Sequence, residues 1–335
     1  MRDLRPFIDS VATIIESHSL GTPGGYRRWN SAGPDGRRDI SLNAYGCADA
    51  ANILYTIGRF PSEPDERTGW IKTLRALQDP ATGLFNEATH HPIHTTAHCV
   101  AALELFDALP AHPLTQLAHL RDPDAMIAFL EALDWRNNPW NASHQGAGLY
   151  AALVMTGQTD ADWRDRYFRW LWDETDPATG FQRQGCVAPV SAGGGLSLFP
   201  HLAGSFHYLF NIEHDRRPIR YPERMIDSAL AMFEANAFPI GRSVGFAEID
   251  WLYCINRAFR QSGWRFNDCR AAFRTFADRY LDFLFALQPE TDEGLNDLHR
   301  LFGCICALAE LQAALPGELL TARPLHLPLD RRPFI

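Results

Sequence analysis

Histidine and acidic residues gather in short clusters along this chain, and these residue types exchange protons near neutral pH. About half of the 13 histidines fall in the clusters. Carboxylates and imidazoles that share one enclosed site can acquire different pKa values, which supplies one proton donor and one acceptor. The clusters occupy residues 43–49, 94–98, 141–145, 201–207, 248–250 and 296–299. We therefore expect a general acid–base site assembled from several of them.

Each cluster lies at the start of a predicted apolar helix, where free backbone N–H groups favour anions. The predicted catalytic side chains are Asp250, Asp49, Asp297, His144 and His207. The predicted substrate-binding side chains are Tyr45, His94, His98, Trp140, Gln145, His201, Glu248, Trp251 and His299. Asp250 is the preferred acid or base, with Asp49 or Asp297 as its partner. Because Glu248 and Asp250 are two residues apart, at most one of them is expected to face the cavity if both are helical.

Simpler interpretations of the same residues stay open. Asp, Asn, Ser and Thr at helix starts are ordinary N-caps, and a single histidine is often a buried structural side chain. His94 and His98 are spaced i, i+4, which also suits a metal ion, with His201 or His207 as a further ligand. Since this spacing is common by chance, we expect no metal and no other cofactor, although the sequence leaves the question of a metal open.

Aromatic residues accompany the polar clusters, among them Tyr45, Trp140 and Trp251. Flat rings stack on the C–H faces of sugars while neighbouring polar groups bind the hydroxyls. The alternative is that these rings fill the core. Arginines in loops at the same end of the predicted helices could bind a carboxylate in a bidentate way, which indicates an acidic sugar. These arginines are Arg37, Arg38 and Arg183.

The clusters recur at a spacing of roughly fifty residues, which is typical of an array of two-helix units. Two kinds of predicted helix alternate, one amphipathic and one apolar on most sides. The amphipathic, outer helices are predicted at 5–18, 64–78, 122–133, 160–174, 221–236 and 269–287. The apolar, inner helices are predicted at 45–58, 95–109, 143–156, 202–212, 247–262 and 296–314. The pattern predicts an all-α fold, an (α/α)6 toroid with little sheet.

Turn chemistry supports these boundaries. Residues 79–83 and 176–180 both read Asp-Pro-Ala-Thr-Gly, and each follows an outer helix and precedes an inner one. Proline stops the helix and glycine permits the positive φ of a tight turn. We predict a single domain over residues 1–335, because each unit needs its neighbours to cover its apolar face. Residues 315–335 are rich in proline and are expected to form an extended C-terminal strap on the outside.

Residues 77–85 (Leu-Gln-Asp-Pro-Ala-Thr-Gly-Leu-Phe) and 94–103 (His-Thr-Thr-Ala-His-Cys-Val-Ala-Ala-Leu) carry a resemblance to α/α-toroid proteins. The chain resembles the six-hairpin glycosidase superfamily, which includes glycoside hydrolases, polysaccharide lyases and sugar epimerases. More distantly it resembles the terpenoid-cyclase and protein-prenyltransferase toroids. The likeness covers most of the chain at the level of architecture and identifies no single family.

The departures from these groups prevent any transfer of catalytic residues. The D-x-D-D acid motif of class II terpene cyclases and the D-D-x-x-D metal motif of class I enzymes are absent. Cys304 and Cys306 do not lie in the context of the zinc set of lanthipeptide cyclases. The candidate site above therefore depends on position in the repeat.

Composition limits the possible partners. The chain has 335 residues and a formal net charge of -9, which argues against nucleic acid as the main partner. No apolar run approaches the length of a membrane span, and the first residues lack the apolar segment of a secretory signal. The 7 cysteines are scattered and read as reduced, buried residues. We expect a cytoplasmic protein; the sequence does not indicate its oligomeric state.

These observations predict a carbohydrate-active enzyme that acts on an oligosaccharide or an acidic sugar by acid–base catalysis in a central cavity. Hydrolysis by two carboxylates and a histidine-based lyase or epimerase reaction both fit. One alternative is an isoprenoid cyclase with an aromatic cavity and a buried acid. The other alternative is a non-enzymatic helical-array binding protein, which would show an open surface without converging ionisable groups.

Overall fold

A computed structural model describes residues 1–33, 35–187, 198–237 and 240–335. Helices dominate these residues, so the prediction of an all-α fold with little sheet is confirmed. In the described part of the chain, no helix is both long and apolar enough to cross a membrane. The helices with apolar sequences are α2 (Ala44–Thr56), α4 (Pro92–Glu104), α6 (Pro139–Met155), α8 (Phe199–His214), α10 (Ala247–Ser262) and α12 (Leu298–Ala314). The helices that alternate with them are α1 (Arg5–Ser17), α3 (Pro64–Ala76), α5 (Pro123–Ala132), α7 (Ala161–Asp173), α9 (Pro222–Glu234) and α11 (Phe266–Ala286).

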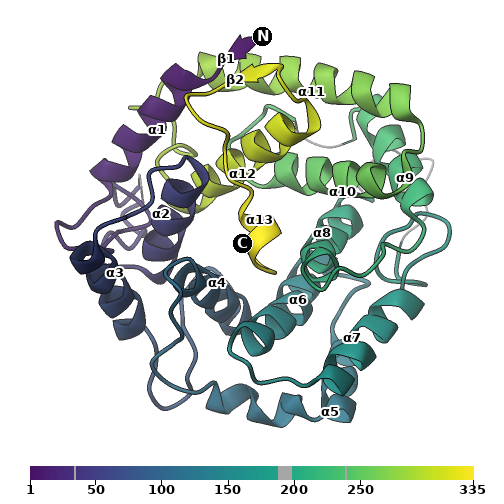
Figure 1. Cartoon of the computed structure of the whole chain (residues 1–335), viewed down its shortest axis with the longest axis horizontal. Helices are drawn as coiled ribbons and strands as arrows, with labels where there is room; N and C mark the ends of the chain where they lie inside the picture. The colour runs from purple at the N-terminus through teal and green to yellow at the C-terminus, as the bar shows by residue number, and fades with distance from the viewer. Residues whose placement is uncertain (34, 188–197, 238–239) are drawn as a thin grey trace.

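The apolar helices contact one another in cyclic order. Each of α2, α4, α6, α8, α10 and α12 packs on the next, and α12 packs back on α2 (Figure 1). We call these six helices the inner ring. The alternating helices lie around the inner ring, and a short 3-10 helix, η1 (Thr115–Arg121), precedes α5.

Residue composition explains which helix lies where. On α12, residues on every side are buried, from Leu298 to Leu311, because neighbours cover the helix all round. On α7 the buried residues Trp163, Tyr167, Trp170 and Leu171 recur at the i, i+4, i+7, i+8 spacing of one helix face, and Phe168 is buried beside them. A helix with one apolar face packs on the inner ring and leaves its other face in water.

The repeated Asp-Pro-Ala-Thr-Gly turns have the local structure that their residues predict. In the first copy the Asp79 carboxylate accepts the backbone N–H of Ala81 at 2.8 Å and the hydroxyl of Thr82 at 2.9 Å. Gly83 has a φ of 76° and donates its N–H to the Asp79 carbonyl at 2.8 Å. Gly180 closes the second copy with a φ of 75°. These turns send the chain from an outer helix toward the start of the next inner helix.

The two ends of the described chain meet in the only sheet formed by the described residues. Strand β1 (Arg2–Asp3) pairs in parallel with β2 (Leu319–Leu320), which follows α12. This pairing joins α1 to the segment that leaves the last inner helix. It lies at the rim of the molecule, where Figure 1 shows both strands beside α11.

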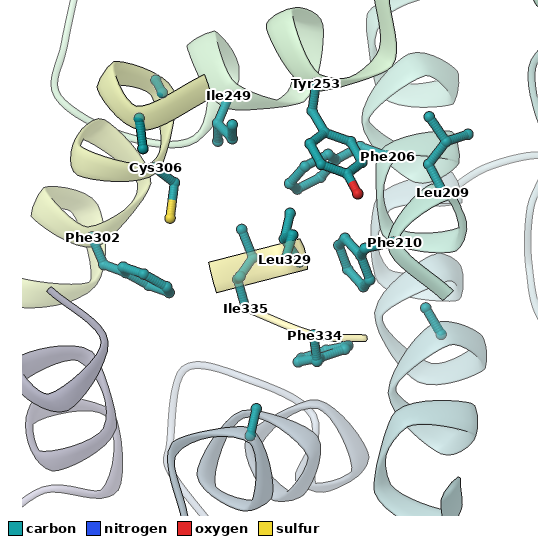
Figure 2. Packing of buried hydrophobic residues seen from close by; sticks show 14 of the residues in the cluster. Phe206, Leu209, Phe210, Ile249, Tyr253, Phe302, Cys306, Leu329, Phe334 and Ile335 are labelled. Atoms are coloured by element: carbon teal, nitrogen blue, oxygen red, sulfur yellow. The ribbon is translucent and has the colours of Figure 1, made fainter. Parts of the chain in front are cut away.

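The C-terminal strap differs from the prediction that residues 315–335 pack on the outside. Helix α13 (Pro328–Arg331) and the last residues turn into the middle of the inner ring (Figure 2). Phe334 is fully buried, and its ring lies 5.4 Å from that of Phe210 and 4.9 Å from that of His94. The physical reason is that a closed ring of helices leaves an apolar hole at its centre, which Leu329, Phe334 and Ile335 fill.

Candidate functional site

A cavity of about 300 Å³ lies at the N-terminal ends of the inner-ring helices. Histidines from four of these helices and from the loop before α4 line its wall, and the end of the C-terminal strap contributes Ile335. The lining side chains are Arg28, His90, His94, Trp140, His144, Phe206, His207, Val244, Phe246, Glu248, His299, Arg300 and Ile335. The cavity wall is therefore part imidazole and part apolar.

Arg28 reaches the cavity from the loop before α2. Its Nε and Nη2 donate to the two oxygens of Asp297 at 2.8 and 3.1 Å, and its Nη1 donates to Thr89 Oγ1 at 2.7 Å. Gly46 on α2 permits this approach, because a Cβ there would lie 2.6 Å from the backbone nitrogen of Arg28. Asp297 also caps α12 by accepting the N–H of His299 at 3.1 Å. The predicted catalytic residue Asp297 is thus held by an arginine and a helix start.

Asp49 joins two histidines beneath the cavity. Its Oδ1 lies 2.8 Å from Nε2 of His98 and 3.3 Å from Nδ1 of His299. Burial favours a raised pKa for this carboxyl group, but the attraction of His299 and His98 and their hydrogen bonds prevail, so its pKa lies well below the usual range. The carboxylate is therefore ionised and accepts hydrogen bonds from His98 Nε2 and His299 Nδ1, which leaves Nε2 of His299 without a proton.

Tyr45 lies between these histidines and the cavity wall. Its hydroxyl hydrogen-bonds Nδ1 of His94, and its ring stacks on His90 and His98 at centroid distances of 4.4 and 4.8 Å. Burial raises the pKa of Tyr45 well above its usual value, so the phenol is neutral. These contacts connect Tyr45 on α2 with three imidazoles, one just before α4 and two on α4.

His94, His144 and His207 come from three consecutive inner-ring helices and meet at the cavity. The ring centroids of His94 and His144 are 4.2 Å apart, and those of His144 and His207 are 4.4 Å apart. Burial first, and then repulsion by neighbouring histidines, lowers the pKa of all three; for His207 that neighbour is His90, and the pKa falls to about 3. Each of them is a neutral imidazole with a nitrogen lone pair.

The two acidic residues on α10 point to different places, as their spacing predicted. Glu248 lines the cavity, and its Oε1 accepts the N–H of Gly241 at 2.9 Å. Burial raises the pKa of Glu248 to about 7. Asp250 is fully buried and not among the cavity-lining residues, and neither of its oxygens has a hydrogen-bond partner within the described residues. Burial, and then the charge of Glu248, raises the pKa of Asp250 well above the usual value.

Three other predicted site residues lie away from the cavity wall. Trp251 packs between α10 and its outer neighbours, where Nε1 donates to the Ala229 carbonyl at 2.9 Å and the ring stacks on Phe276. His201 is buried in the first turn of α8, and Gln145 bonds the Asn141 carbonyl at 3.4 Å on its own helix. Trp140 does line the cavity, beside His144.

Sequence reasoning missed several lining residues. Arg28, Phe246 and Arg300 were not selected, and neither was His90, which stacks on Tyr45. His90 adjoins the predicted cluster and could have been found by extending it to the His-His-Pro run before α4. The arginines that were selected form ion pairs instead, as in the contacts of Arg183 with Glu174 and of Arg38 with Glu293.

Comparison of the chain with protein-family models, curated proteins and solved structures finds no match. The chemistry of the site must therefore be inferred from the geometry of its own residues.

Proposed function

We propose that this protein is a lyase or epimerase that removes a proton from the carbon next to the carboxylate of a small acidic sugar bound in the central cavity. His299 accepts the proton, and Glu248 donates one. The observation that carries the proposal is that these two groups line one cavity, in which burial lowers the pKa of His299 to about 4 and raises that of Glu248 to about 7. We also assign the fold to the α/α-toroid class, an assignment that rests on the cyclic contacts of the inner ring.

The Asp49–His299 pair has the arrangement of a general base. Nδ1 of His299 donates to Asp49, so the lone pair on Nε2 is available, and the carboxylate stabilises the imidazolium that forms when a proton is taken up. Burial lowers the pKa of His299 to about 4, so that it is unprotonated in neutral solution. The pKa of Glu248, near 7, leaves a proton available for donation.

Both reactions begin with the same step. The C–H bond next to the carboxylate breaks, the proton moves to His299 Nε2, and the electron pair passes into the carboxylate. In an epimerase the carbon is protonated again from the other face by Glu248. In a lyase Glu248 protonates the oxygen that leaves from the neighbouring carbon.

Hydrolysis by two carboxylates has less support. Such a mechanism needs two carboxyl groups on either side of the scissile bond. Asp49 is hydrogen-bonded to two histidines, and Asp297 is hydrogen-bonded to Arg28. Asp250 is not among the cavity-lining residues. Glu248 is the carboxyl group that remains on the cavity wall within the described residues.

Arg300 is suited to bind the substrate carboxylate. It lines the cavity, remains exposed, and forms no ion pair with another described residue. A guanidinium group binds a carboxylate in a bidentate way, which would withdraw charge as the electron pair develops. Trp140 and Phe246 supply the flat surfaces on which a sugar ring can stack.

Proton exchange in D2O tests the proposal. The protein is incubated with glucuronate, galacturonate and their short oligomers, and NMR follows deuterium entry next to the carboxylate and the formation of unsaturated sugar. We expect exchange or elimination with a member of this panel, and a bell-shaped pH dependence set by His299 on the acid side and Glu248 on the alkaline side. Absence of both reactions across the panel would exclude the proposal, and capture of farnesyl diphosphate alone would favour the isoprenoid alternative.

Variants assign the roles. His299→Gln and Glu248→Gln should each lower the rate by about 10²-fold or more, and Glu248→Gln should also remove the alkaline limb of the pH profile. Asp49→Asn should act through His299 by changing its tautomer. Glu310→Gln is the matched control, because Glu310 is a buried carboxylate that accepts from Arg257 at 2.9 Å, away from the cavity. Unchanged rates in His299→Gln would show that another group is the base.

A further inference from the structure

We propose that His94, His144 and His207 bind a zinc ion at the wall of the central cavity. Each residue offers one ring nitrogen, and these three nitrogens lie within 4.8 Å of one another. The ligands come from α4, α6 and α8, and α6 packs on both of the other two helices. This inference goes beyond the proposed function, since zinc binding can be measured without any substrate.

The hydrogen bonds behind His207 select its metal-facing nitrogen. Ser143 Oγ lies 2.7 Å from the Trp140 carbonyl and 2.9 Å from Nδ1 of His207. The serine hydroxyl has one proton, and the shorter contact assigns that proton to the Trp140 carbonyl. Ser143 Oγ therefore accepts from Nδ1 of His207, which leaves Nε2 without a proton and directed away from Ser143. An imidazole held in this way is typical of zinc sites.

His94 has equivalent support. Its Nδ1 hydrogen-bonds the Tyr45 hydroxyl, and Thr95 Oγ1 donates to the His91 carbonyl at 3.4 Å, which leaves the Thr95 oxygen able to accept. A phenol can accept one hydrogen bond and donate another, so Tyr45 can accept Nδ1–H of His94 and donate to Thr95. Nε2 of His94 is then the ligand atom. As for His207, one ring nitrogen contacts the protein and the other is available to the metal.

His144 is the clearest sign that a ligand is needed. Its side chain is nine-tenths buried, between His94 and His207, and no hydrogen bond joins its ring nitrogens to another described residue. A buried polar side chain without a partner is costly, and a cation that takes its lone pair removes the cost. The same cation offsets the repulsion among three neighbouring lone pairs.

Three neutral imidazoles suit zinc, which is commonly tetrahedral in proteins. The cavity leaves a fourth position open to water or to an oxygen of the substrate. Sites with three protein ligands and an open position polarise a bound oxygen. A second group, Asp49 with His98 and His299, also satisfies the spacing for a metal. In that group both histidines bond the same oxygen of Asp49, Oδ1, while Oδ2 of Asp49 and Nδ1 of His98 have no hydrogen-bond partner within the described residues, so variants must distinguish the two groups.

Zinc titration of the full chain tests the proposal. The protein is stripped with a chelator and titrated with Zn²⁺ against a chromophoric competitor, and Co²⁺ is added separately to record its visible spectrum. We expect one equivalent of Zn²⁺ per chain and the intense visible bands of four-coordinate Co²⁺. A stoichiometry below one half, or only the weak bands of six-coordinate Co²⁺, would overturn the proposal with no variant required.

Variants locate the ion. His144→Gln and His207→Gln should weaken zinc binding by more than about 100-fold, and Ser143→Ala by about 10-fold, as expected for loss of a ligand and of its hydrogen-bond partner. His214→Gln, on the same helix as His207 but at its other end, should bind zinc as the unchanged protein does. Zinc affinity that survives in His144→Gln and His207→Gln, or that is lost in His98→Gln instead, would show that the ion is not held by these three histidines.

Discussion

At the scale of single residues, the site is defined by which nitrogen of each imidazole carries the proton. Asp49 places a proton on His98 Nε2 and on His299 Nδ1, while Ser143 places one on Nδ1 of His207. The opposite tautomers of His98 and His299 follow from their approach to one carboxylate from two helices. A different hydrogen-bond partner for any one of these rings would move its proton, so that a ring nitrogen that accepts a hydrogen bond would donate one instead.

Residue types and positions predicted part of this arrangement. His94, His144, His207, His299, Glu248 and Trp140 were selected because they follow helix starts, and they line the cavity. The side chains of Asp250 and Trp251 could not be placed in this way. Both lie on α10, where every residue from Glu248 to Ala258 is buried, so burial on this helix does not mark the face that looks into the cavity. Arg28 was missed because it lies in a loop whose path depends on Gly46.

His18 provides a test of pH-dependent stability outside the site. It is fully buried, and its Nδ1 lies 3.1 Å from the Arg27 carbonyl oxygen. Burial lowers its pKa from the usual 6.5 to about 4. Because the pKa is lower in the folded than in the unfolded chain, the contribution to stability is complete above pH 6.5 and is lost as the pH falls toward 4. The expected loss is about 1.4 kcal/mol per pH unit.

Urea unfolding of His18→Gln as a function of pH measures this contribution. The variant should lose less stability than the unchanged protein as the pH falls through this window. His119→Gln is the control, because it replaces an exposed histidine by the same residue. Parallel curves for His18→Gln and the unchanged protein would contradict the assignment of His18 as a neutral buried residue.

At the scale of elements, the helix boundaries were predictable and the tail was not. The apolar and amphipathic periods predicted α2 at 45–58 and α10 at 247–262, and the structure places them at Ala44–Thr56 and Ala247–Ser262. The period of apolar residues shows which side chains must be buried against a neighbour, so it locates a helix well. The segment after α12 has no period, and its position depends on a hole that exists only when the ring is assembled.

Glycines at the helix starts let loops approach the inner ring closely. Gly46→Ala should destabilise the fold by about 1–3 kcal/mol and displace Arg28, because the new methyl group would overlap the backbone of the loop. Thermal and denaturant unfolding measure the first effect, and loss of uronate binding measures the second.

Gly148→Ala is the matched control for this change. Gly148 also lies on an inner helix, but its nearest neighbour to an added Cβ is the Ile93 side chain at 3.3 Å. Since alanine favours helix by about 1 kcal/mol over glycine, the net change there should be close to zero. Equal effects of the two substitutions would mean that the loop contact at Gly46 does not limit the fold.

At the scale of the whole molecule, the C-terminal strap supports the ring from within. Arg332 is buried and donates to Asn52 on α2, while the Pro333 carbonyl accepts from Asn211 on α8 at 2.9 Å. These contacts join opposite sides of the inner ring through its centre. Phe334 and Ile335 close the hole beneath the cavity, so the floor of the site is made by the last residues of the chain.

Phe334→Ala tests this support. Removal of a fully buried phenylalanine should lower the free energy of unfolding by about 3–5 kcal/mol. Phe285→Ala, at a position that is 48% exposed, should change it by less than about 1 kcal/mol. Chemical denaturation at one pH is sufficient for the comparison, and an equal, small effect of both substitutions would show that the strap is only loosely attached.

Closure of the ring between α12 and α2 has a consequence for how the protein is made. The first inner helix finds one of its two neighbours only when residues near position 300 have left the ribosome, and the cavity has no floor until the last residues follow. Contacts between residues this distant in sequence form late, and until they form the apolar surface of the unpaired helix is exposed. A nascent chain that has not reached Ile335 therefore lacks part of the cavity wall, and it is over this interval that it would need protection by a chaperone.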